Sequence, residues 1–522
     1  METYFKKNLL KKRLEFLLSE KVLTLLLLFL ALISIFLLQN HKTGFEDGHH
    51  GFLSSHGITL AKSIFSGSRL LMFTEKSILE DGTISYDAYN RFPIFPFLII
   101  GTALRAFEPN LAEQIYIARQ IMNLFFVASI ILSFLISYEL LKNYFLSVSA
   151  TLLVFSSYYM LYYNDMIFND TPALFGFVLA LFLTIKSHVQ KHRLRTIVLL
   201  SIVSISMGWQ PYAVFISWFL SETFHLFATK KKPISRFRRM TSQPSFIGLV
   251  SAILWGLTIL GLQLFNEWSF VGGSFQEIPT IQKAFWRLGI MSEQSYAQHE
   301  SVLEWSNFLA DQLWRTVRMI IPFAEIFQVN LGSTRRLILL ACVGGLILIV
   351  GLVTFRKKFN PIMVTTFLMS GLIWAIPMHH FVAFHDFQSL FFVGFSLLFF
   401  IIVSLYINPK FIRVIALAIC LMFVLSVRTM NVKKDAVAKT VNSITHEFQA
   451  IYDHLPKDSI VFVDGDRHRL GIGYHALDFY LINTYSASPD SAEYVISPDP
   501  AYNQNKVTNN EHINLFINSS EP

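Results

Sequence analysis

Long apolar runs recur along the whole chain, and short loops rich in lysine and arginine separate them. Several of these runs are long enough to cross the hydrocarbon core of a bilayer, which is about 30 Å thick. Over 522 residues, 53% are hydrophobic and only 15% are charged. That balance excludes an ordinary soluble domain of this length. The runs therefore predict an α-helical protein that crosses a membrane many times.

Eleven membrane-spanning helices are expected, with residues 1–20 on the cytoplasmic side, because the dense basic clusters then all fall on one face. Two long loops, 39–115 and 266–334, then lie on the external face. The apolar segment 92–107 is short and contains two prolines, so it is interpreted as a juxtamembrane or re-entrant helix; a full crossing is the alternative. The spans expected are 21–38, 116–141, 145–161, 172–186, 196–208, 212–228, 245–265, 337–355, 361–377, 389–406 and 414–427.

The composition changes after about residue 427. Three short β-branched or aromatic runs at 459–464, 493–497 and 513–518 are typical of strands, and 470–482 is typical of a helix. Residues 428–522 are therefore expected to form a small external α/β domain, and 21–427 the transmembrane domain. The net charge of +8 arises from the basic loops between spans, so it does not indicate nucleic-acid binding. Cys342 and Cys420 lie in apolar runs and are expected to be free thiols.

This topology brings three polar clusters to the external face. They are Glu46, Asp47, His49 and His50 after the first span; Asp165 and Asp170 before the fourth; and His379, His380, His385 and Asp386 after the ninth. A carboxylate there can act as general base toward a hydroxyl group. Carboxylates and histidines together are able to hold a divalent cation, with His49, His50, His379, His380 and Asp386 as the candidate ligands. Lys62, Arg91, Arg119, Arg287 and Arg315 lie on the same side and are suited to phosphate oxygens, with His385 as a further substrate-binding candidate.

Each of these patterns also has a purely structural interpretation. Glu46 and Asp47 are able to cap an interfacial helix, and Asp170 is able to cap the fourth span, with Pro172 in its first turn. The histidines are also typical of interfacial polar residues. Arg119 is able to extend toward lipid headgroups. No phosphate-binding loop, nucleophile elbow or dinucleotide fingerprint occurs in the sequence.

The order of short motifs resembles the GT-C superfamily of polytopic glycosyltransferases, in particular the bacterial branch related to protein O-mannosyltransferases and lipid A aminoarabinose transferases. An acidic pair, Glu46-Asp47, follows the first span, and Tyr89-Asn90-Arg91-Phe92-Pro93 closes the first external loop. Ala118-Arg119 opens the second span, and an acidic loop from Asn164 to Pro172 precedes the fourth. The resemblance covers nearly the whole chain, although each motif is short.

The resemblance implies a function as well as a fold. It implies that Asp47 is catalytic, with Glu46 as its neighbour, and that Asp165 or Asp170 binds substrate. It also implies a polyprenyl-phosphate sugar as donor and a glycan, lipid or protein hydroxyl as acceptor. The His49-His50 pair departs from the family pattern, which leaves a divalent cation or a different acceptor open.

Two other classes of function are compatible with many spans. A transporter or flippase needs charge near the middle of its spans. Only Glu139 and Glu222 stand out there, both toward the inner end, which favours an enzyme that acts at one membrane face. A non-catalytic assembly subunit is the third possibility, for which Asp47 would be dispensable.

Overall fold

The structure is a computed structural model. It describes residues 19–38, 48–66, 72–79, 82, 84–107, 111–189, 194–228, 239–271, 278–290, 303–323, 334–456, 459–464, 484–486, 492–497, 506–508 and 514–517.

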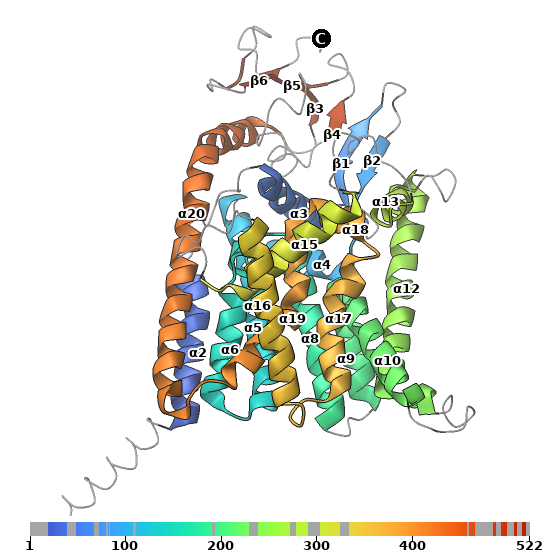
Figure 1. Ribbon diagram of the computed structural model, residues 1–522. Helices are drawn as coiled ribbons and strands as arrows, with labels where there is room; N and C mark the ends of the chain where they lie inside the picture. The colour runs from blue at the N-terminus through green and yellow to red at the C-terminus, as the bar shows by residue number, and fades with distance from the viewer. Residues whose placement is uncertain are drawn as a thin grey trace, which may run out of the picture.

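Most of the described chain is a bundle of helices, and a small sheet lies at one end of the bundle (Figure 1). Helices occupy all eleven predicted span ranges. The helices of the bundle are α2 (Glu20–Leu37), α5 (Leu111–Leu141), α6 (Tyr144–Phe155), α7 (Tyr158–Tyr162), α8 (Asp170–Val189), α9 (Leu194–Met207), α10 (Pro211–Ala228), α12 (Pro244–Val271), α16 (Thr334–Thr354), α17 (Pro361–Ala375), η3 (Asp386–Phe392), α19 (Val393–Ser404), η4 (Pro409–Phe411) and α20 (Ile412–His454).

Six of these helical stretches are long and apolar enough to cross a membrane by length and composition: 20–37, 113–141, 170–187, 244–270, 386–404 and 409–435. The others are shorter. With these helices the chain is an integral, multi-pass membrane protein; the number of crossings stays a prediction.

The basic loops lie together at one face of the bundle. The turns between α5 and α6, between α16 and α17, and between α19 and α20 are all at the bottom of Figure 1. These turns carry Lys142, Arg356, Lys357, Lys358 and Lys410. This is the charge asymmetry expected of a cytoplasmic face.

Four helices lie at the opposite end and cover the bundle. They are α3 (Gly48–Ser66), α4 (Phe95–Phe107), α13 (Pro279–Arg287) and α15 (Trp305–Ile320), with the short α18 (His379–Phe384) among them (Figure 1). Helix α4 has 13 residues, so at about 1.5 Å per residue it is too short to cross the bilayer core. That length agrees with the juxtamembrane interpretation of 92–107.

The sheet joins two regions that are far apart in the sequence. Its strand order is β2-β1-β4-β3-β5-β6. Strands β1 (Phe73–Ile78) and β2 (Ile84–Ala88) form a hairpin in the first long loop, and β1 pairs in parallel with β4 (Thr484–Ser486), with Lys76 opposite Thr484. The remaining strands are β3 (Ile460–Val463), β5 (Tyr494–Ser497) and β6 (Asn514–Ile517), at the three predicted positions.

The predicted division at residue 427 needs a correction, because it falls inside α20. This helix runs without a break from the membrane-spanning part to His454, and the sheet includes a hairpin from the first loop. The strands of the C-terminal part therefore share a sheet with the first loop. The predicted helix at 470–482 lies outside the described residues.

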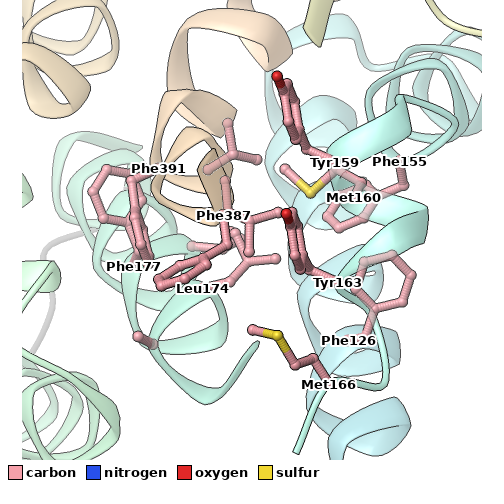
Figure 2. Close-up of a cluster of buried hydrophobic side chains, with 14 of the residues drawn as sticks. Phe126, Phe155, Tyr159, Met160, Tyr163, Met166, Leu174, Phe177, Phe387 and Phe391 are labelled. Atoms are coloured by element: carbon pink, nitrogen blue, oxygen red, sulfur yellow. The ribbon is translucent and has the colours of Figure 1, made fainter. Parts of the chain in front are cut away.

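Aromatic side chains fill the bundle beneath the covering helices. Figure 2 shows Tyr163 and Phe387 facing one another across the space between α7 and η3, with ring centroids 5.9 Å apart. Phe177 of α8 packs on Phe391 at 5.6 Å. These contacts fix the segment between α7 and α8, which carries both acidic residues of the second external loop.

Candidate functional site

The loop 163–169 is held directly beneath α3. A Cβ atom at Gly57 would overlap the carbonyl oxygen of Ile167, so only glycine permits this approach. The backbone N–H of Ile167 also donates to the Ser54 hydroxyl at 3.4 Å. Helix α3 begins one residue after Asp47 in the sequence, so its packing connects the two external loops that carry the predicted acids.

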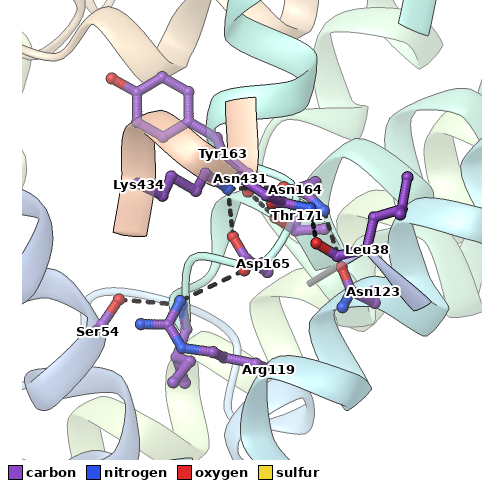
Figure 3. A network of polar contacts seen from close by, with 11 residues as sticks. Leu38, Ser54, Arg119, Asn123, Tyr163, Asn164, Asp165, Thr171, Asn431 and Lys434 are labelled. Carbon is purple, nitrogen blue, oxygen red and sulfur yellow. Dashed lines mark hydrogen bonds and ion pairs between the residues drawn. The ribbon is translucent and has the colours of Figure 1, made fainter. Parts of the chain in front are cut away.

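Asp165 of this loop forms ion pairs with two cations inside the protein. Its Oδ1 atom lies 2.5 Å from Lys434 Nζ on α20, and its Oδ2 atom lies 3.5 Å from Arg119 Nη1 on α5. All three side chains are almost fully buried. Figure 3 shows the carboxylate between the two cations. We call these three residues the Asp165 ion cluster.

The Asp165 ion cluster continues into a chain of amides. Lys434 Nζ donates to Asn164 Oδ1 at 2.8 Å, and Asn164 Nδ2 donates to Asn123 Oδ1 at 2.9 Å. One turn before Lys434, Asn431 Nδ2 donates to the carbonyl of Leu38, at the end of α2, at 2.9 Å. The cluster thus joins α2, α5, α20 and the loop 163–169 at one buried place.

Asp170 stands in a different environment at the start of α8. Its Oδ1 atom accepts from Gln388 Nε2 at 2.8 Å, and Gln388 Oε1 accepts from Trp374 Nε1, also at 2.8 Å. Its Oδ2 atom is buried and has no hydrogen-bond partner among the described residues. Arg287 of α13 is the cation that interacts electrostatically with it. Asp165 and Asp170, which the sequence did not distinguish, therefore have separate partners.

A cavity of about 260 Å³ is lined by Trp374, the residue that Gln388 connects to Asp170. Its walls come from α12, α13 and α17 and from the turn between α9 and α10, with Trp374 and Gln210 among the residues that line it. Two of its lining leucines, Leu257 and Leu288, are 61% and 40% exposed. Leu257 lies on α12, which is long and apolar enough to cross a membrane, so the cavity opens beside an apolar face that is suited to lipid.

Two arginines line the same cavity. The Arg287 guanidinium lies over the rings of Phe381 at 4.5 Å and Phe92 at 5.0 Å, and that of Arg91 over Tyr89 at 4.2 Å. The Nε atom of Arg91 is buried without a hydrogen-bond partner among the described residues. The Arg91 backbone is fixed by Trp209 Nε1, which donates to its carbonyl at 3.0 Å. An apolar cavity with cations on its wall suits an amphiphilic anion.

Other predicted phosphate ligands have different surroundings. Lys62 is half-buried on α3, and burial lowers the pKa of its ammonium to about 8. Arg315 is buried, donates to the carbonyls of Val382, Ala383 and His385, and pairs with Asp311 at 2.6 Å. It therefore anchors α15 to α18, and the predicted phosphate contact is not supported for Arg315.

The residues of the third predicted cluster, His379, His380, His385 and Asp386, have three separate sets of partners. The His379 ring stacks on Trp305 with ring centroids 4.6 Å apart. The centroid of the His380 ring lies 4.3 Å from that of His379. Burial lowers the pKa of both imidazoles. His385 Nδ1 lies 2.7 Å from the carbonyl of Phe381, and Asp386 Oδ1 accepts from the Tyr163 hydroxyl at 2.6 Å.

Within the described part of the chain, no three His, Cys, Asp or Glu residues converge into a group that could hold a metal ion. The described candidates His379, His380 and Asp386 therefore do not fit a cation as a set. Glu46 and Asp47 lie outside the described residues. His49 and His50 lie in the first turn of α3, but their side chains are outside the described part.

Several residues of these clusters were not predicted from the sequence. Lys434 was assigned to the C-terminal domain; its position on an apolar helical stretch that continues from the last span was the available signal. Gln210, Trp374 and Gln388 are polar or aromatic residues near span ends, and nothing in their spacing indicates that two of them line a cavity and the third connects it to Asp170. They become visible only when α8, η3 and the α9–α10 turn are placed together.

Solved structures with similar folds exist, although no protein-family model and no curated protein matches the chain. ArnT from Cupriavidus metallidurans bound to undecaprenyl phosphate aligns over 96% of this chain and 99% of its own, with 12% identity and a TM-score of 0.57. Its apo state gives 12% identity, coverage of 95% and 98%, and a TM-score of 0.55. The apo oligosaccharyltransferase from Archaeoglobus fulgidus aligns over 91% of this chain and 66% of its own, with 12% identity and a TM-score of 0.50. The chain therefore has the fold of the GT-C superfamily of polytopic membrane glycosyltransferases.

Proposed function

We propose that this protein is an integral membrane glycosyltransferase. It moves a sugar from a polyprenyl-phosphate donor to a hydroxyl group of a glycan, lipid or protein, on the face opposite the basic loops. The fold supports this class of protein. The cavity lined by Arg91 and Arg287 is the observation that carries the proposal for the donor, because it combines lipid-facing leucines with two cations.

The donor enters the cavity sideways from the bilayer. Its polyprenyl chain stays against the apolar wall that includes Leu257 and Leu288, and its phosphate lies against Arg91 and Arg287. Guanidinium groups are suited to this role, because they stay charged and donate several hydrogen bonds in a fixed plane. A bound phosphate would also accept from the buried Arg91 Nε atom, which has no other described partner.

The reaction is a displacement with inversion at the anomeric carbon. The acceptor oxygen forms a bond to that carbon while the bond to the phosphate oxygen breaks, and the electron pair leaves with the polyprenyl phosphate. Asp47 takes the proton from the acceptor hydroxyl, as the family resemblance implies. Arg91 and Arg287 stabilise the added negative charge on the departing phosphate.

Turnover of polyprenyl-phosphate sugars tests this proposal. Purified wild type is compared with Asp47→Asn and Arg287→Ala on a panel of donors, with and without chelator. We expect wild-type turnover to be abolished in Asp47→Asn. Arg287→Ala is expected to lower kcat/KM by about 10- to 100-fold, since a hydrogen bond to a charged group contributes roughly 1.5–3 kcal/mol.

Lys358→Ala on the opposite face of the bundle is the matched control and should retain wild-type turnover. Activity unchanged in Asp47→Asn would reject Asp47 as the base. Unchanged polyprenyl-phosphate affinity in Arg287→Ala would reject the cavity as the donor site. Loss of activity with chelator would add a cation to the mechanism. If wild type releases sugar from none of the donors, the proposal is contradicted, and transport of a lipid-linked or small anionic substrate is the function to test next.

A further inference from the structure

A group of buried polar atoms lies between the start of α8 and the turn after α9. Both amide atoms of Asn169, the Oδ2 atom of Asp170 and the Oε1 atom of Gln210 have no hydrogen-bond partner among the described residues. The three side chains are 0–1% exposed. We call these three residues the polar niche. A buried polar group without a partner costs about 1–3 kcal/mol, so three neighbouring side chains in this state indicate a ligand.

The members of the polar niche come from two elements that are in close contact. Gly208 lies in the turn after α9. A Cβ atom placed on it would be 2.7 Å from Gln210 Oε1 and 2.4 Å from Ala173 Cβ. Ala173 donates its backbone N–H to the carbonyl of Asn169 at 2.9 Å, within the first turn of α8. The side-chain amide oxygen of Gln210, Oε1, is therefore next to the turn that carries Asn169 and Asp170.

The polar niche adjoins the cavity through Gln210 and, indirectly, through the partner of Asp170. Gln210 itself lines the cavity. Asp170 is connected to it through Gln388, which holds the indole of the cavity-lining residue Trp374. A molecule whose phosphate lies against Arg91 and Arg287 therefore has the polar niche within the same site.

The unpaired atoms of the polar niche define what it binds. Three are oxygen acceptors and one, Asn169 Nδ2, is a donor. A phosphate group offers oxygen acceptors only and would be repelled by the Asp170 carboxylate. A sugar ring offers hydroxyl groups, which donate to such acceptors and also accept from an amide. The two arginines and the polar niche are thus chemically complementary to the two ends of a sugar phosphate.

We propose that Asn169, Asp170 and Gln210 bind the hydroxyl groups of the sugar that is transferred, and so select the donor. This inference rests on the proposed function, since it places the sugar beside the phosphate held by Arg91 and Arg287. It assigns to Gln210 and Asn169 a substrate-specificity role that the sequence motifs do not indicate.

The test separates binding of the sugar from binding of the phosphate. Affinities are measured for bare polyprenyl phosphate and for polyprenyl phosphate that carries mannose, glucose, galactose or arabinose. Wild type should bind at least one of the sugar-bearing lipids about tenfold more tightly than the bare lipid, a difference of about 1.4 kcal/mol, because the sugar hydroxyls add hydrogen bonds. Gln210→Met and Asn169→Ala should each lose most of this difference and keep their affinity for bare polyprenyl phosphate.

Thermal unfolding without ligand provides the second measurement. Gln210→Met and Asn169→Ala remove polar atoms without partners, so neither variant should melt below wild type; a purely structural role would lower the Tm. Ser404→Ala is the matched control, because its hydroxyl is also buried without a described partner but lies at the far end of α19. It should leave the tenfold preference unchanged.

Two results would overturn the inference. One is wild-type affinity that no sugar increases above that of bare polyprenyl phosphate. The other is a preference that persists in Gln210→Met and Asn169→Ala. If instead bare polyprenyl phosphate does not bind, or binds equally well to Arg287→Ala, the proposed donor site itself fails, which is a different outcome.

Discussion

Asp165 and Asp170, the two acids between α7 and the first turn of α8, belong to clusters of opposite character. On one side, Asp165 is paired with Arg119 and Lys434, and Lys434 is bonded further to Asn164. On the other, one carboxylate oxygen of Asp170 and the buried Nε atom of Arg91 have no hydrogen-bond partner among the described residues. Both carboxylate oxygens of Asp165 are paired with cations, and such buried pairs hold elements together, whereas polar atoms that lack a described partner beside a cavity are available to a ligand. We propose that this difference separates a structural cluster from the donor-binding site, although Asp165 and Asp170 are only five residues apart in the chain.

The largest effect is expected from the Asp165 ion cluster. Asp165→Asn keeps the size of the side chain but leaves two buried cations without a carboxylate, so the free energy of unfolding should fall by about 3–5 kcal/mol. Thermal unfolding of the detergent-solubilised protein measures this. Lys434→Met in the Asp165→Asn background should recover part of the loss, because it removes one of the unpaired charges.

Asp311→Asn is the comparison variant for that prediction. Asp311 also pairs with an arginine, Arg315, at 2.6 Å, but its side chain is 36% exposed. Its removal should cost about 1 kcal/mol or less, since solvent screens the pair. Equal losses at Asp165 and Asp311 would show that burial of the charges does not decide the strength of the pair.

The helical part of the fold could be predicted from the sequence because it depends on local composition. Apolar runs and basic loops placed helices in all eleven predicted ranges, and the two prolines of 92–107 indicated a short helix rather than a crossing. The sheet could not be predicted in the same way. Strand β1 pairs with β4 across about 400 residues, and such pairing depends on where the bundle brings the two segments, not on either segment alone.

The position of α3 on the loop 163–169 gives the second prediction. Gly57→Ala introduces a methyl group where the carbonyl of Ile167 lies, so α3 or the loop must move. The expected loss in unfolding free energy is about 1–3 kcal/mol. Because the displaced loop carries both Asp165 and Asp170, sugar transfer should also fall, which unfolding and turnover assays on the same variant measure.

Gly261→Ala on α12 is the control for this substitution. No atom lies within 4 Å of a Cβ built there, and alanine favours a helix over glycine. It should be neutral or slightly stabilising. A Gly57→Ala protein as stable and as active as Gly261→Ala would show that the close approach between α3 and the loop is not required.

The candidate site was only partly predictable, for a physical reason. Arg91, Asp165 and Asp170 lie in motifs next to span ends, where charge is conspicuous against an apolar background. Gln210 and Lys434 do not stand out, because a lone glutamine beside Trp209 or a lysine on a helix is usual in a membrane protein. Their significance depends on burial and on which neighbours lack partners, and both follow from packing between distant helices.

The smallest effect on stability is expected from a substitution of Arg91. This substitution is the sharpest test of the contrast between the Asp165 ion cluster and the residues beside the cavity. Arg91→Met keeps an unbranched side chain but removes a guanidinium whose Nε atom has no described partner. The contact with Tyr89 at 4.2 Å and the electrostatic attraction to the Glu267 carboxylate are lost, so the unfolding free energy should fall by only about 1 kcal/mol. Affinity for polyprenyl phosphate should nevertheless fall by about 10- to 100-fold, because a charged hydrogen-bond donor to the phosphate is gone. A loss of stability comparable to that of Asp165→Asn would mean that Arg91 is a structural charge like Arg119, and the distinction between paired and unpaired clusters would no longer identify the donor site.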